Sequence, residues 1–328
     1  MEKSEYELFK VFEDAGCFIR ETNFKRRSKN PFSDLSLYSE YKKIMKETKP
    51  DLVITYTIKP NVYAGRAALT LGIPYFANVT GLGTAFQNKG LLMKLSTFLY
   101  KWGTKRADII FYQNEESRKV FESLGIKGKK SVNLPGSGIN LDRFPFKDYP
   151  DGEIRLLYMA RIMRDKGAEE FLYAIEKIKE KYKDVIIDVV GSSDDEFKDR
   201  LDKMAKKGII NAYGWRTDTE TFFEKCSCVI QPSYHEGMSN VVLEGAATGR
   251  VIVCSDIPGC REAVIDNESG FLVKVKDKDS LLEGLERFMA LSYEEKCEMG
   301  KKARKHIEEN FDRKIVVEKV KREIMEVL

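Results

Sequence analysis

The stretch CSCVIQPSYHEGMSNVVLEGAATG, residues 226–249, carries the clearest structural pattern in the sequence. A β-rich apolar run, CSCVIQP, is followed by a polar loop and then by a helical pattern that begins near Asn240. A strand, a loop and a helix in this order form the repeating unit of parallel α/β domains. The stretch therefore predicts an open α/β sheet whose ligand-binding edge lies at this loop.

Two carboxylates flank the expected helix start, Glu236 just before it and Glu244 one turn inside it. The free N–H groups at such a start favour a diphosphate, and here they belong to Gly237, Met238, Ser239, Asn240 and Val241. Carboxylates beside a phosphate site repel the phosphate. Their presence there makes sense if they accept hydrogen bonds from the hydroxyls of a sugar joined to it. The pair thus favours a nucleotide sugar, although a solvated acid beside a helix-capping acid fits the spacing equally well.

Two cations are expected at the same sheet edge. MARIMRDKGAEEFLYAIEKI, residues 159–178, is a strand end, a basic loop and an amphipathic helix, and it contains Arg161 and Lys166. Both cations would face a diphosphate bound in the crevice. Alternatively, Arg161 and Lys166 are ordinary solvated surface charges. The acidic pair at the same sheet edge makes this alternative the less favoured one.

Short apolar runs separated by helical patterns continue along the whole chain, as expected for parallel strands covered on both faces. We expect strands at residues 51–57, 74–80, 107–113, 129–135, 153–160, 184–191, 208–214, 226–232 and 250–256. The length of 328 residues favours two domains. We predict an acceptor-side Rossmann-like domain over 1–140, a linker over 141–152, a nucleotide-sugar domain over 153–310 and a closing helix over 311–328.

The beginning of the chain departs from this plan. SEYELFKVFEDAG predicts a helix, and CFIR, residues 17–20, predicts a short strand directly after it. A Rossmann-like domain should instead open with a strand and a loop that leads into a helix. We therefore expect the first domain to lack its opening strand–helix–strand, roughly 50 residues, and we favour truncation over a naturally reduced domain.

Composition excludes several classes of protein. A net charge of +4 is too small to indicate nucleic-acid binding, and no apolar run is long enough to span a membrane. Six scattered cysteines without metal-ligand spacing indicate reduced thiols in the cytosol. Asp277 and Asp279 form the one D-x-D pattern, which precedes a helical run and suits a helix N-cap better than a metal site.

Taken together, Arg161, Lys166 and the E-x7-E pair of Glu236 and Glu244 resemble the donor site of retaining glycosyltransferases of family 4, which have the GT-B fold. GSGIN, residues 136–140, and DIPGCREAVIDNESGFLV, residues 256–273, are similar to that family as well. TYTIKPNVYAGRAALTLGIPYFANVTGLGTAF, residues 55–86, resembles its bacterial subset acting on undecaprenyl-diphosphate-linked sugars.

The resemblance implies two Rossmann-like domains whose parallel sheets face each other across a cleft, with a UDP-sugar as co-substrate and no metal or other cofactor. It assigns Arg161 and Lys166 to the donor diphosphate, Glu236 to the hexose and Glu244 to the ribose. The loop containing Gly214 and Trp215 would flank the base, with Trp215 equally explained as a partly buried aromatic.

On the acceptor side the chain departs from the family pattern. Many relatives have a histidine where this sequence has Thr80, so no general base is assigned. Gly81 and Gly83 would allow donor and acceptor to approach closely, or would simply turn the chain. An internal-return mechanism, in which the leaving phosphate takes the acceptor proton, needs no base.

A membrane surface is the last expected partner. Residues 89–106, KGLLMKLSTFLYKWGTKR, form a basic amphipathic pattern that suits the lipid interface, or an ordinary core-facing helix. Arg26, Arg27 and Lys29 would assist at anionic headgroups. We therefore expect a cytoplasmic enzyme, peripheral to the inner face of the cell membrane, that transfers a hexose or N-acetylhexosamine to a lipid-linked saccharide in capsule, O-antigen or glycan biosynthesis. A non-hydrolysing UDP-sugar epimerase and an inactive nucleotide-sugar-binding fragment are the alternatives.

Overall fold

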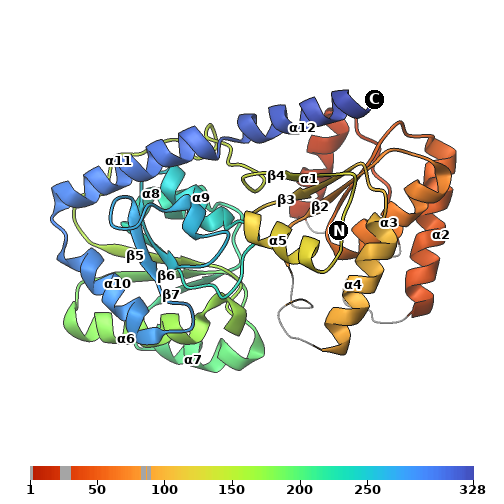
Figure 1. Ribbon diagram of the computed structural model, residues 1–328. Coiled ribbons are helices and arrows are strands. Elements are labelled where there is room, and N and C mark those ends of the chain that lie inside the picture. The colour runs from red at the N-terminus through yellow and green to blue at the C-terminus, as the bar shows by residue number, and fades with distance from the viewer. Residues whose placement is uncertain (1–2, 23–30, 83–85, 87–89) are drawn as a thin grey trace.

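The computed structural model describes residues 3–22, 31–82, 86 and 90–328, and it contains two parallel α/β domains side by side (Figure 1). The first sheet has the strand order β1-β2-β3-β4, and the second has the order β10-β9-β8-β5-β6-β7. All these strand pairs are parallel. Two Rossmann-like domains with parallel sheets are thus confirmed.

The first sheet consists of β1 (Val53–Tyr56), β2 (Tyr75–Val79), β3 (Ile109–Tyr112) and β4 (Lys130–Asn133). Its helices are α1 (Lys3–Asp14), α2 (Pro31–Thr48), α3 (Ile58–Leu71), α4 (Leu91–Thr104) and α5 (Glu115–Ser123). A core of β2 and β3 side chains with α3, α4 and α5 residues fills one face of the sheet. Tyr100 and Phe121 meet there edge to face, 4.9 Å between ring centroids.

The second sheet consists of β5 (Arg155–Met159), β6 (Ile186–Val190), β7 (Asn211–Gly214), β8 (Cys228–Gln231), β9 (Val251–Ser255) and β10 (Gly270–Val273). Its helices are α6 (Ala168–Lys181), α7 (Asp195–Lys206), α8 (Glu220–Lys225), α9 (Asn240–Ala247), α10 (Lys278–Ala290) and α11 (Tyr293–Asn310), with 3-10 turns η2 (Arg164–Lys166) and η3 (Arg261–Ala263).

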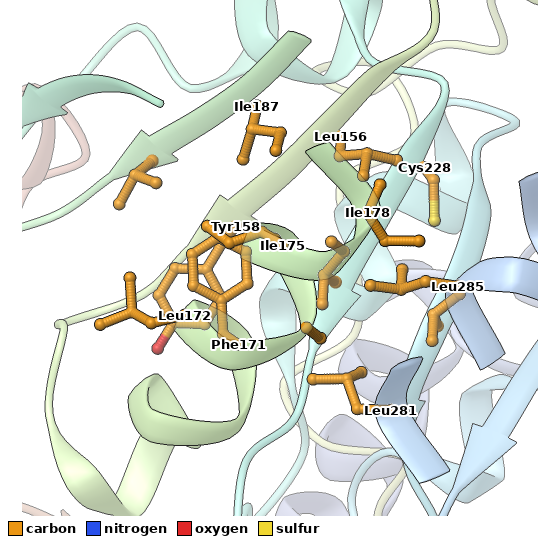
Figure 2. Packing of buried hydrophobic residues seen from close by; sticks show 14 of the residues in the cluster. Leu156, Tyr158, Phe171, Leu172, Ile175, Ile178, Ile187, Cys228, Leu281 and Leu285 are labelled. Atoms are coloured by element: carbon orange, nitrogen blue, oxygen red, sulfur yellow. The ribbon is translucent and has the colours of Figure 1, made fainter. Parts of the chain in front are cut away.

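Both faces of the second sheet are covered. On one face α6 presents Phe171, Leu172, Ile175 and Ile178, whose helical spacing places them along one buried stripe. Figure 2 shows Tyr158 of β5 lying against Phe171, and the two rings stack 4.2 Å apart. The other face is covered by α9 and α11 in a second apolar cluster. This double cover explains why the strands are continuous apolar runs.

The last helix, α12 (Arg313–Val327), crosses from the second domain to the first (Figure 1). Val316 is buried on the first sheet against a cluster that includes Phe76 and Phe111. Lys130 of β4 pairs with the buried carboxylate of Glu323 at 2.6 Å. The helix therefore covers the second face of the first sheet.

Residues 141–152 lie against the second domain. Phe144 and Tyr149 are buried in the two clusters of that domain. The fully buried Arg250 donates to the carbonyl oxygens of Asp148 at 3.1 Å and Phe223 at 2.8 Å. The chain passes between the domains twice, near Ile139 and near Arg313, and the two passages are hydrogen-bonded to each other. The Ile139 amide donates to the Phe311 carbonyl at 2.8 Å, and the Ile139 carbonyl accepts from the Arg313 amide at 2.9 Å.

Each of the nine expected strand segments contains a strand, but two details differ. The prediction of a strand at residues 17–20 was wrong, since this segment has irregular backbone with Phe18 fully exposed. In the described part of the chain β1 pairs only with β2, so CFIR has no neighbour with which to form a ladder. The edge strand β10 was not expected; it is four residues long and adjoins β9.

Candidate functional site

A cavity of about 670 Å³ lies between the two domains, at the carboxyl ends of strands from both sheets. The first domain contributes Thr57, Ile58, Lys59, Thr80, Gly81, Leu82, Tyr100, Asn114, Glu116 and Ser117. The second contributes Met163, Asp165, Lys166, Tyr234, His235, Glu236, Gly237, Ile257, Pro258 and Val275. Open α/β folds bind their ligands at this edge, so the position is typical of a binding site.

Glu236 and Lys166 form an ion pair in the wall of this cavity, with 2.6 Å between Lys166 Nζ and Glu236 Oε1. The structure brings Lys166 to this point by close packing of its loop. Gly167 has φ 69°, and a Cβ there would lie 2.1 Å from the Pro232 carbonyl oxygen just beyond β8. The Tyr158 hydroxyl also donates to the Lys166 carbonyl at 3.0 Å. The cation is therefore held beside the carboxylate by backbone as well as by charge.

The helix start expected near Asn240 is confirmed. α9 begins at Asn240 with Ser239 as its N-cap, whose hydroxyl accepts from the Val242 amide at 3.4 Å. The Ser239 amide donates to the Gly259 carbonyl at 2.7 Å, so that N–H is already engaged. The Gly237, Met238, Asn240 and Val241 amides remain as candidate phosphate donors.

The domains meet at Gly237. Asn114 caps α5 by accepting from the Ser117 amide at 2.8 Å, and its Nδ2 donates across the cleft to the Gly237 carbonyl at 2.7 Å. A Cβ on Gly237 would lie 2.2 Å from the Thr80 carbonyl oxygen, and one on Gly81 would lie 3.3 Å from Gly237 Cα. The structure thus brings Thr80 and Gly81 directly against the loop that carries Glu236. Gly83 lies outside the described residues, as do Arg26, Arg27 and Lys29.

Several predicted donor residues are absent from the lining of this cavity, namely Met238, Ser239, Asn240 and Val241 around the start of α9, and Arg161, Glu244, Gly214 and Trp215. Arg161 is half exposed and pairs with Asp194 at 2.6 Å. Gly214 ends β7, at the far edge of the sheet from β9 and β10, and the Trp215 that follows is 63% exposed.

Glu244 is mostly buried in α9 and is likewise absent from the cavity lining. Burial raises the pKa of Glu244 to about 7, and Glu220 adds to the rise while Arg143 and Arg313 oppose it. The opposition is limited, since the Arg143 guanidinium is itself paired with Glu220.

His235 lines the cavity next to Glu236. Partial burial lowers its pKa, Lys276 lowers it further, and Asp165 and Glu236 act in the opposite direction. A neutral imidazole at neutral pH can donate or accept a hydrogen bond but brings no charge to a phosphate.

The Asp277 pattern is an N-cap, as expected. The Asp277 side chain accepts from the Asp279 amide at 3.1 Å and the Ser280 amide at 2.9 Å at the start of α10. Within the described residues, no group of three or more His, Cys, Asp or Glu side chains is arranged to hold a metal ion.

Comparison with known proteins decides the family. The sequence matches the family described as Glycosyl transferases group 1 over residues 142–306 and the one described as Glycosyl transferase 4-like over residues 12–114. It is 30% identical, over 82% of this chain and 76% of the relative, to N,N'-diacetylbacillosaminyl-diphospho-undecaprenol alpha-1,3-N-acetylgalactosaminyltransferase of Campylobacter jejuni. The chain belongs to the glycosyltransferases.

Another relative of this glycosyltransferase is UDP-Gal:alpha-D-GlcNAc-diphosphoundecaprenol alpha-1,3-galactosyltransferase of Escherichia coli, 27% identical over 77% of this chain and 69% of the relative. Among solved structures, HepE of Anabaena in complex with UDP-glucose has a TM-score of 0.80 at 14% identity, covering 98% of this chain and 89% of the other. The glycosyltransferase of Rickettsia africae has a TM-score of 0.79 at 20% identity, covering 98% and 87%. The GT-B fold implied by the resemblance is confirmed.

One surface of the glycosyltransferase lies outside the cleft. On α4, Leu91, Leu92, Leu95 and Phe98 are 84%, 51%, 52% and 64% exposed, and we call these four residues the α4 strip. The opposite side of the helix is buried through Ser96, Tyr100 and Gly103. Searched over its described residues, the chain has no helix with the length and apolarity needed to cross a bilayer.

Among the residues of the site that sequence reasoning missed are Gln231, Ser233 and Asn114. A signal existed for the first, because a glutamine ends the apolar run CSCVIQ. A buried amide in a strand needs a partner, and the partner here is Glu236. No signal existed for Asn114, which reaches a residue 123 positions away in the other domain.

Proposed function

We propose that this glycosyltransferase moves a hexose or an N-acetylhexosamine from a UDP-sugar to a saccharide linked to polyprenyl diphosphate, in capsule, O-antigen or glycan biosynthesis. The observation that carries the proposal is the Lys166–Glu236 pair at 2.6 Å, beside the start of α9 and inside the interdomain cavity. A cation and a carboxylate side by side at this position would suit the diphosphate and the hexose of a nucleotide sugar.

The donor assignment follows from this chemistry. The free amides before and within the first turn of α9 would bind the diphosphate, and Lys166 would neutralise the charge that grows on the leaving nucleotide. Glu236 would accept hydrogen bonds from hexose hydroxyls. The UDP-glucose complex of the Anabaena neighbour supports a UDP-sugar as donor. Glu244 would bind the ribose, Arg161 the diphosphate and Trp215 the base.

The acceptor assignment follows from the relatives. The names of the Campylobacter and Escherichia enzymes describe undecaprenyl-diphosphate-linked acceptors. A lipid-linked acceptor requires the enzyme to work at a membrane, and the α4 strip, with exposed Lys94 and Lys101 on the same helix, suits a lipid interface. We propose that the enzyme binds the cytoplasmic face of the cell membrane through this strip.

We propose that transfer retains the anomeric configuration. The bond from the sugar C1 to the phosphate oxygen breaks, and a bond from C1 to the acceptor oxygen forms on the same face. The acceptor proton passes to the leaving phosphate oxygen, so Thr80 is not required to act as a base. Because Lys166 supplies the counter-charge, transfer is expected to continue in EDTA without a metal ion.

A donor screen tests the proposal. The protein is incubated with a panel of UDP-hexoses and UDP-N-acetylhexosamines and with polyprenyl-diphosphate N-acetylglucosamine, and lipid products are weighed by mass spectrometry. We expect the mass of the lipid-linked acceptor to increase by one sugar residue. With an α-linked UDP-sugar as donor, we expect the NMR spectrum of the product to show an α-anomeric proton. Conversion of the UDP-sugar without an acceptor would contradict the proposal and indicate an epimerase.

A further inference from the structure

Two buried polar residues lie beside Glu236, outside the lining of the cavity. Gln231 ends β8 and is 2% exposed, and Ser233 follows two residues later and is fully buried. Gln231 Nε2 lies 3.1 Å and Ser233 Oγ 2.8 Å from Glu236 Oε1. Both therefore contact the same carboxylate oxygen as Lys166 Nζ.

The direction of each hydrogen bond in this group follows from the donors and acceptors that are present. Ser233 has one hydroxyl hydrogen, which it donates to Glu236 Oε1, so its oxygen accepts from Gln231 Nε2 at 2.7 Å. The amide nitrogen of Gln231 donates to both Ser233 Oγ and Glu236 Oε1. The reversed amide would point Gln231 Oε1 at a carboxylate oxygen, which is repulsive.

This arrangement leaves Gln231 Oε1 buried and, within the described residues, without a hydrogen-bond partner. An orphaned buried acceptor is destabilising. A glutamine selected for stability alone would have both ends satisfied. Gln231 instead hydrogen-bonds Glu236 through Nε2, while its Oε1 is left without a partner among the described residues.

The three donors act on one oxygen of Glu236 only. Within the described part of the chain Oε2 receives no hydrogen bond, although the residue lines the cavity. A carboxylate held through one oxygen has a fixed orientation and keeps the other oxygen available as an acceptor.

We propose that Gln231 and Ser233 are positioning residues: they hold Glu236 through Oε1 so that Oε2 accepts a hydrogen bond from a hydroxyl of the donor sugar. This inference rests on the proposed function, since it takes Glu236 as the sugar-binding acid. Neither side chain touches the substrate, and both act through the orientation of Glu236.

Calorimetric titration with UDP and with UDP-sugars tests the proposal, because Glu236 serves the sugar and not the nucleotide. The probes are UDP, UDP-galactose and UDP-N-acetylgalactosamine. In Ser233→Ala the ratio of the Kd for the preferred UDP-sugar to the Kd for UDP should rise about tenfold or more, since a hydrogen bond to a charged group is lost. Ser233→Thr keeps the hydroxyl and should restore the ratio.

Ser227→Ala is the matched control. Ser227 is equally buried, 2% exposed, precedes the opposite end of β8, and its hydroxyl accepts from the Arg155 amide at 3.1 Å. The two alanine variants lose comparable buried hydrogen bonds, so a purely structural effect would appear in both. We expect the ratio to be unchanged in Ser227→Ala.

Gln231→Glu adds a readout that depends on pH. It sets a second carboxyl beside Glu236, and two such groups close together cannot both ionise without repulsion. At low pH the shared proton restores an O–H···O hydrogen bond and the affinity for the UDP-sugar. As pH rises through the elevated pKa of the pair, the affinity for the UDP-sugar should fall by more than the affinity for UDP, so the ratio of the two Kd values should rise.

Two results would overturn the inference. Equal ratios in wild type, Ser233→Ala and Ser227→Ala would show that Ser233 does not position Glu236. A pH-independent ratio in Gln231→Glu would show the same for Gln231. Failure of the proposed function is distinguishable, because the wild-type protein would then give no lipid-linked product in the donor screen, whatever the Kd ratios of the variants.

Discussion

Glu236 illustrates which part of the site a sequence can give. The spacing of Glu236 and Glu244 and the position of Lys166 predict a carboxylate and a cation at one sheet edge, and the structure brings Lys166 and Glu236 to 2.6 Å. The same reasoning did not predict that Lys166 pairs with Glu236 or that Arg161 pairs with Asp194. Side-chain pairing depends on packing such as that of Gly167 against Pro232, which the sequence pattern does not contain.

Glu244 gives a prediction about stability. Burial raises its pKa from 4.5 to about 7, so between these values the folded protein binds the proton more tightly than the unfolded chain. The free energy of unfolding contributed by this group therefore falls as pH rises through that window. Glu244→Gln removes the titration and should raise Tm relative to wild type by several degrees at pH 8, but by little at pH 4.5.

Differential scanning calorimetry at several pH values measures this trend. Glu309→Gln is the control, since Glu309 is a surface residue of α11 at 3.9 Å from Lys305. A Tm difference for Glu244→Gln that stays constant from pH 4.5 to 8 would contradict the assignment.

At the scale of elements, regular segments were predicted well because their signals are local. The start of α9 and the N-cap at Asp277 depend on residues within one turn. Strand assignment failed where pairing decides. CFIR has β-branched and aromatic residues but no neighbouring strand in the described part of the chain, whereas the short GFLV of β10 pairs with β9. Pairing is a property of the sheet and not of the segment.

Helix α4 gives a prediction about the membrane. Replacing Leu95 and Phe98 together by glutamine removes two exposed apolar side chains without adding charge. Binding to vesicles that contain anionic phospholipid should fall tenfold or more, because each side chain contributes roughly 1.5–3 kcal/mol when buried in an apolar phase. Vesicle co-sedimentation measures the partition.

Met325→Gln is the matched control for this experiment. Met325 is 78% exposed on α12, so the Met325→Gln variant loses an exposed apolar side chain from a different helix. Its vesicle binding should match wild type. If the α4 double variant binds as the control does, the strip is not the membrane contact.

At the scale of the whole molecule, the domains are joined by features that sequence reasoning could not locate. Asn114 and Gly237 meet across the cleft at 2.7 Å, and α12 returns from the second domain to cover the first sheet. A closing helix was predicted from apolar spacing, but the spacing does not say which sheet it covers. Contacts between domains involve residues that are distant in sequence and individually unremarkable.

Gly237→Ala tests the interdomain contact. The added Cβ would lie 2.2 Å from the Thr80 carbonyl oxygen and 2.5 Å from Gln113 Oε1, so the domains must separate. We expect turnover to fall at least tenfold and small-angle X-ray scattering to show a larger radius of gyration. Gly90→Ala is the control, because among the described residues no atom beyond its chain neighbours lies within 4 Å of its added Cβ. An unchanged radius with normal turnover would contradict the contact.

The proposed function depends above all on the pair of Lys166 and Glu236. The rate of sugar transfer in Lys166→Met tests this dependence most directly. Single-turnover transfer from the UDP-sugar to polyprenyl-diphosphate N-acetylglucosamine is measured with enzyme in excess, and circular dichroism checks the fold. Removing one electrostatic donor from a preorganised site costs about 10²–10³ in rate, so we predict a loss of at least about 100-fold with an intact fold. A well-folded variant that transfers the sugar within about threefold of the wild-type rate would contradict the proposed role of Lys166.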